Sequence, residues 1–156
     1  MNGIFHKIGI RAGTSEIIDA LTTQAGLSGW WTREVGGAFT NGVSAAGDTL
    51  HFEFTGKGRF DMNVLEVSPQ RVLWTCSDGP EDWIGSHIDF SLKPGTAADG
   101  VPMTLVFFQH RDWKKESDFT AHCSMKWATF LLSLRNLVET GHGQPAPGDI
   151  KIDDMN

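Results

Sequence analysis

Residues 117–141 read SDFTAHCSMKWATFLLSLRNLVETG. Large apolar side chains recur in this stretch at steps of three and four residues, the spacing of one face of an α-helix. They are Phe119, Cys123, Trp127, Phe130, Leu131, Leu134, Leu137 and Val138. Ser117 or Asp118 can cap the start, and Gly141 followed by Pro145 ends the helix. About 23 residues at ~1.5 Å each give a rod of roughly 34 Å, which can cross a whole β-sheet.

The chain before this helix is typical of successive antiparallel strands. Stretches rich in β-branched and aromatic residues alternate with turn residues. We predict strands at Leu50–Phe54, Arg59–Val67, Arg71–Cys76, His87–Leu92 and Pro102–Gln109. Pro94–Gly100 is expected to be one of the turns. Alternation directs large side chains such as Phe52, Trp74 and Phe90 to one face of the sheet.

The N-terminal part predicts one strand and two short helices. Apolar residues alternate with others along Ile4–Ile10, as in a half-buried strand. Thr14 or Ser15 is expected to cap a helix that runs to about Thr22. A second short helix then leads to Trp31, and glycine-rich turns and short strands follow.

This order of elements indicates an α+β fold, with a curved antiparallel sheet of six to seven strands around the long C-terminal helix and two short helices after the first strand. A sheet of that size is some 30 Å wide at ~4.8 Å per strand, and it curls because strands twist. A helix only about 10 Å thick cannot fill the concave face, so we expect an apolar space beside it. A single domain is predicted over residues 1–141, and the Gly, Pro and Asp content of residues 142–156 predicts a flexible tail.

The side chains expected to line this space come from the second short helix, the strands and the long helix. They are Trp31, Phe52, Phe54, Val64, Trp74, Cys76, Phe90, His122, Lys126, Trp127 and Phe130. Apolar contact would supply most of the affinity for a ligand, and His122 and Lys126 would orient it. For each single residue, ordinary core packing is the alternative interpretation. Trp30 and Trp31 would either gate the space or anchor the second helix.

No motif for catalysis or metal binding stands out. The six histidines are scattered without Cys-x-x-Cys or His-x-x-x-His pairs, so we expect no metal. His122 has no evident orienting carboxylate for work as a general base, and the catalytic residues stay unassigned. Cys123 lies in the apolar phase of its helix and is expected to be a buried, unreactive thiol. Polar pairs two residues apart on strands, such as His87 with Asp89, are expected on the solvent side of the sheet.

Composition excludes several classes of partner. The chain has 156 residues, with 13 basic and 19 acidic side chains and a net charge of −6. The positive field that nucleic acids and anionic membranes require is therefore missing. No stretch approaches the ~20 apolar residues of a membrane span. Two cysteines and the lack of a signal-peptide pattern lead us to expect a cytoplasmic protein.

Four features of the chain resemble a known family. They are the first strand followed by Thr14–Leu21, the segment LTTQAGLSGWW at 21–31, the strand pair VLEVSP at 64–69 with RVLW at 71–74, and Lys126-Trp127 with Leu131, Leu134 and Leu137. In this order and spacing the sequence resembles the SRPBCC or START-like superfamily with its helix-grip fold. More closely, it is similar to the branch of the C-terminal domain of the Hsp90 ATPase activator. The resemblance implies a sheet wrapped around the last helix, with a cavity that often accepts apolar or amphipathic ligands.

Because the superfamily holds lipid carriers, polyketide cyclases and chaperone regulators, three functions follow as hypotheses. The first is binding of a small apolar or amphipathic molecule, without a cofactor. The second is an enzyme of the cyclase, dehydratase or hydrolase type that uses the same cavity. The third is a regulator of an Hsp90-type chaperone. We expect a monomer or homodimer, with no nucleic-acid or membrane partner.

Overall fold

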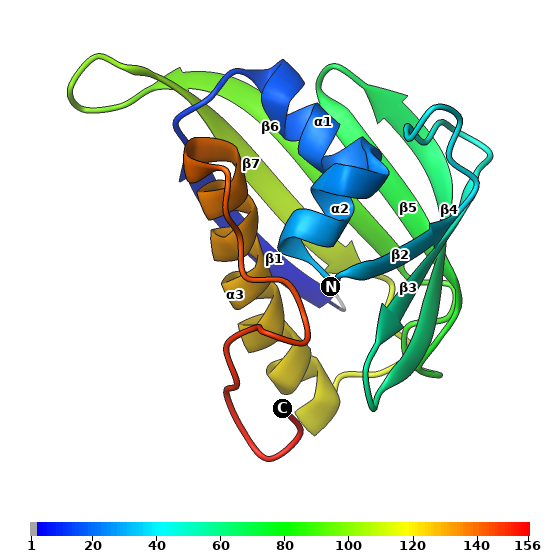
Figure 1. Cartoon of the computed structure of the whole chain (residues 1–156). Helices are drawn as coiled ribbons and strands as arrows, with labels where there is room; N and C mark the ends of the chain where they lie inside the picture. The colour runs from blue at the N-terminus through cyan, green and yellow to red at the C-terminus, as the bar shows by residue number, and fades with distance from the viewer. Residues whose placement is uncertain (1–2) are drawn as a thin grey trace.

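A seven-stranded antiparallel sheet curves around three helices in the computed structural model (Figure 1). The structure describes residues 3–156, so Met1 and Asn2, with which the expected domain begins, lie outside the described residues. The elements are β1 (Gly3–Ile10), α1 (Thr14–Thr22), α2 (Gln24–Trp30), β2 (Glu34–Gly37), β3 (Thr49–Phe54), β4 (Gly58–Ser68), β5 (Arg71–Asp78), β6 (His87–Thr96), β7 (Pro102–Arg111) and α3 (Asp118–Thr140). The predicted α+β helix-grip fold is confirmed.

The strand order across the sheet is β1-β7-β6-β5-β4-β3-β2, with every neighbouring pair antiparallel. The first and last strands in the sequence are therefore neighbours in the sheet. β1 pairs with β7, from Gly3 opposite Arg111 to Ile10 opposite Thr104. β4 carries register shifts at Asp61/Met62 and Val64/Glu66. Such bulges increase the local twist and help the sheet to curve.

Helix α3 begins and ends as the sequence predicts. The Ser117 side chain accepts a hydrogen bond from the Phe119 backbone N–H, and the Thr120 side chain accepts one from the Ser117 backbone N–H, which completes a capping box. At the other end Gly141 has φ of 87°, a left-handed conformation that glycine adopts without steric cost. The residues that start and end this helix therefore lie within the helix segment itself and can be identified from the sequence.

Helices α1 and α2 lie on the same concave face of the sheet as α3 (Figure 1). The Trp30 indole N–H donates to the Ala20 carbonyl oxygen at 2.8 Å, which ties the two short helices together. The Ser133 hydroxyl donates to the Trp30 carbonyl oxygen at 2.9 Å and joins α2 to α3. Three helices rather than one thus cover the concave face, and the flank occupied by α1 and α2 is filled rather than open.

Two local predictions are wrong. Neither Thr14 nor Ser15 caps α1, because its N-cap is Gly13 and makes no side-chain capping bond. The expected turn at Pro94–Gly100 begins later, since β6 continues to Thr96. Pro94 is tolerated there because the pairing with β5 has already ended at Ser91, so its missing N–H leaves no neighbour unpaired on that side.

The segment 142–156 runs from the end of α3 back along α2 toward the start of α3 (Figure 1). A Cβ at Gly143 would lie 2.3 Å from the Gly29 carbonyl oxygen, so the chain passes α2 at a distance only glycine allows. Ala146 then exchanges backbone hydrogen bonds with Trp31 and Arg33 at 2.9 and 3.0 Å. The flexibility expected from composition stays a prediction, but the segment has specific contacts with the domain.

Candidate functional site

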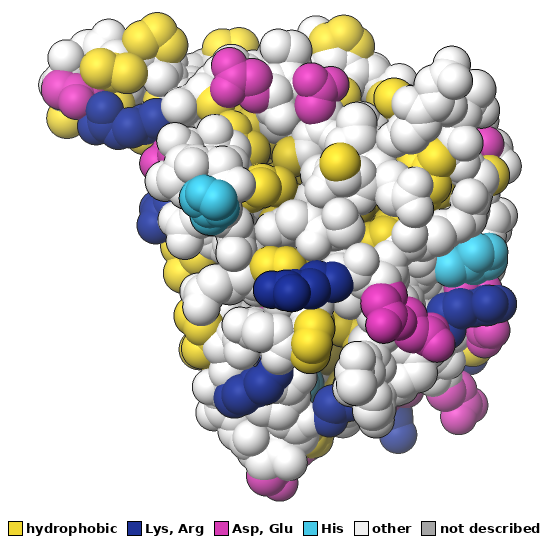
Figure 2. All heavy atoms as spheres, in the orientation of Figure 1, with side chains coloured by type: hydrophobic (Ala, Val, Ile, Leu, Met, Phe, Trp, Pro, Cys, Tyr) yellow, Lys and Arg dark blue, Asp and Glu magenta, His cyan; other side chains and the backbone are white. Residues whose placement is uncertain are grey.

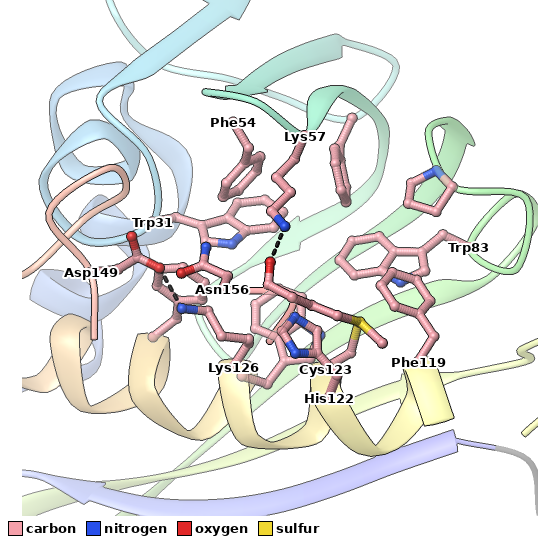
Figure 3. Close-up of a pocket in the computed structure, with 15 residues that line it drawn as sticks. Trp31, Phe54, Lys57, Trp83, Phe119, His122, Cys123, Lys126, Asp149 and Asn156 are labelled. Atoms are coloured by element: carbon pink, nitrogen blue, oxygen red, sulfur yellow. Dashed lines mark hydrogen bonds and ion pairs between the residues drawn. The ribbon is translucent and has the colours of Figure 1, made fainter. Parts of the chain in front are cut away.

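A pocket of about 290 Å³ opens between the first half of α3, the turn joining β3 to β4, and the loop joining β5 to β6 (Figure 3). Its lining combines aromatic rings, the nitrogen-bearing side chains of Lys57, His122 and Lys126, and the end of the chain. The lining residues are Trp31, Phe54, Lys57, Phe60, Pro80, Trp83, Phe119, His122, Cys123, Lys126, Trp127, Phe130, Asp149, Met155 and Asn156. The volume lies near the lower end of the range for small-molecule sites, about 300–1,000 Å³.

Stacked aromatic rings form the floor and walls of the pocket. Trp31 and Trp127 stack with their ring centroids 5.1 Å apart, and Trp83 stacks on Trp127 at 6.1 Å. Phe54 meets Trp31 edge-on at 5.4 Å, and Phe60 meets Trp83 edge-on at 4.8 Å. These rings offer a rigid apolar surface whose shape depends on contacts between side chains from five parts of the chain.

Lys126 lies in the wall of the pocket as half of a buried ion pair. Its ammonium group contacts Asp149 and donates to the Ile150 carbonyl oxygen at 2.7 Å, while Lys151 contacts the other Asp149 oxygen at 2.7 Å. The Asp149 side chain is only 2% exposed. Burial alone would raise the pKa of Asp149, but hydrogen bonds from Lys126 and Lys151 outweigh it and hold that pKa below its usual value.

His122 points toward the pocket from one turn before Lys126 (Figure 3). Its Nδ1 lies 2.7 Å from Oδ2 of Asp153, and its ring stacks on Phe119 at 6.1 Å. The hydrogen bond from His122 lowers the pKa of the Asp153 carboxyl. The sequence did not reveal this carboxylate beside His122, and the catalytic residues stay unassigned.

Both cysteines are buried, unmodified thiols. Cys123 lines the pocket, and burial raises its pKa to about 12, although the Trp83 indole acts against this. A thiol with that pKa stays protonated at neutral pH, and the thiolate is the reactive form. Cys123 therefore contributes apolar surface to the pocket and no nucleophile.

Behind the pocket wall, His110 on β7 is fully buried. The Trp127 indole N–H donates to His110 Nδ1 at 3.1 Å, and His110 Nε2 lies 2.8 Å from the Ser86 hydroxyl. Because an indole can only donate, Nδ1 accepts, and the ring proton sits on Nε2. Burial lowers the pKa of His110 to about 3, so the ring is neutral at pH 7 and fixes the orientation of Trp127.

The structure divides the residues predicted to bind a ligand into two groups. Six line the pocket, namely Trp31, Phe54, His122, Lys126, Trp127 and Phe130. Five lie in the packed core away from it, namely Phe52, Val64, Trp74, Cys76 and Phe90, each at most 1% exposed. In this group Trp31 packs on Phe52 and Trp74, with ring centroids 4.4 and 5.8 Å away, and Trp30 packs on Phe90 at 6.1 Å. Ligand contact by any of these residues stays a prediction.

Several lining residues were not predicted from the sequence. Lys57, Phe60, Pro80 and Trp83 lie in or beside turns, and Phe119 lies at the start of α3. A tryptophan within a turn rich in Gly, Pro and Asp is a usable signal, because a large ring rarely stays in solvent. No local signal marks Asp149, Met155 or Asn156, whose positions depend on the path of the whole C-terminal segment.

On the outer face of the sheet, Asp89 differs from its expected environment. Arg71 holds its carboxylate with two bonds of 3.0 and 2.7 Å, and Arg111 adds one of 2.6 Å. Asp89 is buried under these side chains rather than solvated. Burial opposes ionisation, but the arginine hydrogen bonds prevail and lower the pKa of Asp89.

Within residues 3–156, no group of three or more His, Cys, Asp or Glu side chains is placed to hold a metal ion.

Comparison with solved structures supplies the family. The solution structure of the Aha1 dimer from Colwellia psychrerythraea superposes with a TM-score of 0.77 at 41% identity, covering 92% of this chain and 100% of that one. The chain belongs to the Aha1-like branch of the SRPBCC superfamily. No family model matches this sequence, and no curated protein matches it significantly.

More distant structures share the fold of this Aha1-like protein. DynU16, a putative protein of the dynemicin biosynthetic locus, has a TM-score of 0.68 at 20% identity, over 92% of this chain and 49% of its own. SSP2350 from Staphylococcus saprophyticus has a TM-score of 0.69 at 16% identity, over 92% of this chain and 97% of its own. At these identities the likeness concerns the fold alone.

None of the helices in residues 3–156 combines the length and apolar content that a membrane crossing needs.

Proposed function

We propose that this Aha1-like domain binds a small apolar or amphipathic molecule in the pocket beside α3. The observation that supports the proposal most directly is the ring of stacked aromatic side chains around an accessible volume of about 290 Å³. A ligand that buries ~200 Å² of apolar surface gains about 5 kcal/mol at ~25 cal/mol per Å², before the entropic cost of association is subtracted. Weak to moderate affinity is therefore expected from the apolar contact alone.

The test is a titration of the intrinsic tryptophan fluorescence with 1-decanol, because Trp31, Trp83 and Trp127 line the pocket. We expect a saturable change in the wild-type protein. Cys123→Phe puts an additional ring into the pocket and is expected to weaken decanol binding at least about tenfold, since the space for the ligand is lost.

Ala121→Phe is the matched control, because it adds the same ring on an exposed position of the same helix. Its decanol affinity is expected to equal that of the wild type. Equal affinity of folded Cys123→Phe and wild type would place any binding elsewhere, and no saturable signal in the wild type would contradict the proposal.

A second candidate function is regulation of an Hsp90-type chaperone. It is supported by the 41% identity to the Aha1 structure over nearly the whole chain, and the same similarity supports a homodimer. We expect the protein to stimulate the ATPase rate of such a chaperone about twofold or more at saturation. A rate unchanged across the titration, with both proteins shown to be folded, would remove this function while leaving the pocket proposal intact.

The surface seen in Figure 2 favours specific contacts over a general electrostatic attraction. Lysine and arginine side chains are interspersed there with aspartate and glutamate, and no single-sign patch covers the face. Because the chain has a net charge of −6, it lacks the diffuse positive charge that would hold an anionic macromolecule.

A further inference from the structure

The last residues of the chain lie beside the first half of α3 (Figure 1), and Asn156 lies among the side chains of the pocket (Figure 3). Three nitrogen-bearing side chains of the lining each contact an oxygen atom of this segment. Lys126 contacts Asp149, His122 contacts Asp153 at 2.7 Å, and Lys57 contacts the Met155 carbonyl oxygen. Met155 and Asn156 themselves form part of the lining, so the segment occupies space that a ligand would use.

We propose that the ligand of this pocket is an amphipathic anion, a carboxylate on a short apolar body, whose head group takes the place of Asp153 and the Met155 carbonyl at His122 and Lys57. The inference rests on the proposed function, because it names the ligand class for the same pocket. It also assigns residues 153–156 as an internal competitor that leaves when the ligand enters.

The contacts divide the segment into an anchored and a displaceable part. Asp149 is fully buried between Lys126 and Lys151, and Ala146 is tied to α2 and β2 by backbone hydrogen bonds to Trp31 and Arg33. Removing one partner of such a buried ion pair is strongly destabilising, because it leaves the other charge buried and uncompensated. By contrast, the Asp153 side chain is 34% exposed, and ion pairs of exposed side chains stabilise a protein only weakly. Entry of a ligand therefore displaces residues 153–156 and leaves Asp149 in place.

The nitrogen-bearing side chains at the mouth then determine which head group is preferred. When residues 153–156 leave, His122 and Lys57 lose the oxygen atoms that they contact, whereas Lys126 keeps Asp149. The His122 side chain is only 9% exposed with the segment in place, and a ligand body that replaces the segment covers it again, so a ligand without an acceptor would leave His122 without a partner. A carboxylate at the mouth restores both contacts, and a neutral head group restores them less well. With residues 153–156 still in place, about 290 Å³ is available, roughly ten water volumes at ~30 Å³ each, and this space suits a short apolar body.

The experiment compares decanoate with 1-decanol, which share the apolar chain and differ in the head group. We expect decanoate to bind the wild-type protein at least about tenfold more tightly, by calorimetry at pH 7.5. Lys57→Met is expected to reduce the ratio of the two affinities severalfold, because it removes one cation from the mouth. Lys114→Met, an exposed lysine outside the lining, is the control and should leave the ratio unchanged.

The competitor role has its own variant. Asp153→Asn removes the carboxylate from His122 and is expected to tighten decanoate binding about threefold or more. The matched control Asp154→Asn changes an exposed neighbour that does not line the pocket, and it should bind as the wild type does. Unchanged affinity in Asp153→Asn would overturn the displacement of residues 153–156.

The outcomes separate the two proposals. Equal affinities of decanoate and decanol in the wild type would overturn the anion preference and leave the apolar pocket standing. Absence of binding by both probes would overturn the proposed function and this inference together. A preference for decanoate that Lys57→Met and His122→Gln do not alter would place the anion away from this mouth.

Discussion

Replacing Trp31 with alanine is expected to lower the free energy of unfolding by about 3–5 kcal/mol, the range measured for large buried aromatic residues. Trp31 is 2% exposed and contacts the rings of Phe52, Phe54, Trp74 and Trp127, with centroid distances of 4.4, 5.4, 5.8 and 5.1 Å. These rings come from β3, β5 and α3. Their packing collapses incompletely around an alanine, and a cavity remains.

The measurement is chemical denaturation monitored by far-UV circular dichroism, with a thermal scan beside it. For a chain of this size the melting temperature should fall by roughly 10 °C. Phe5→Ala is the aromatic control, because Phe5 is 55% exposed on β1 and its loss should change stability by less than about 0.5 kcal/mol. Similar stability changes in the two variants would contradict the central position of Trp31.

Acid is expected to destabilise the fold through His110 by about 2–3 kcal/mol between pH 7 and pH 4.5. In the folded chain its pKa is lowered to about 3, while in the unfolded chain it has the ordinary value of 6.5. The unfolded state therefore takes up a proton as the pH falls through 6.5, and the folded state does not. Stability from the neutral ring is complete above pH 6.5 and is lost as the pH falls toward 3, at about 1.4 kcal/mol per pH unit.

His110→Gln tests this linkage against His142→Gln, an exposed histidine. Urea unfolding at pH 7 and pH 4.5 should show that the loss of stability on acidification is about 2–3 kcal/mol smaller in His110→Gln, whereas His142→Gln behaves as the wild type. At pH 4.5 the carboxylates of Asp89 and Asp149 still contribute, because their pKa values lie below the usual 3.8. An unchanged pH dependence in His110→Gln would contradict a neutral buried ring.

The sequence predicts the elements of this fold well where the signals are local. The three- and four-residue apolar spacing, with Ser117 or Asp118 as the cap at the start and Gly141 at the end, predicts the bounds of α3 to within one residue. The alternation of strands such as β5 correctly places Trp74 and Cys76 on the buried face. Each of these signals lies within one element and needs no knowledge of its neighbours.

The site was predictable only in part, because its limits are set by contacts between distant segments. The expected space beside α3 assumed one helix on the concave face, yet α1 and α2 cover one flank and leave the opening at one end. Trp74 and Phe90 share the inward phase of the sheet with pocket residues, and only the position of α2 decides that they are core. His110 follows the inward phase of β7, which was a usable signal for its burial but not for its bond to Trp127.

The most direct test of the binding site is a map of backbone amide shifts, recorded by ¹H–¹⁵N correlation spectroscopy as 1-decanol is added to the labelled protein. Binding in the pocket predicts saturable shifts clustered at Lys57, Trp83, His122 and Lys126, with little change at Phe5 and Leu65 on the outer face. Shifts confined to the outer face, or a spectrum that does not change up to the solubility limit of decanol, would contradict the account.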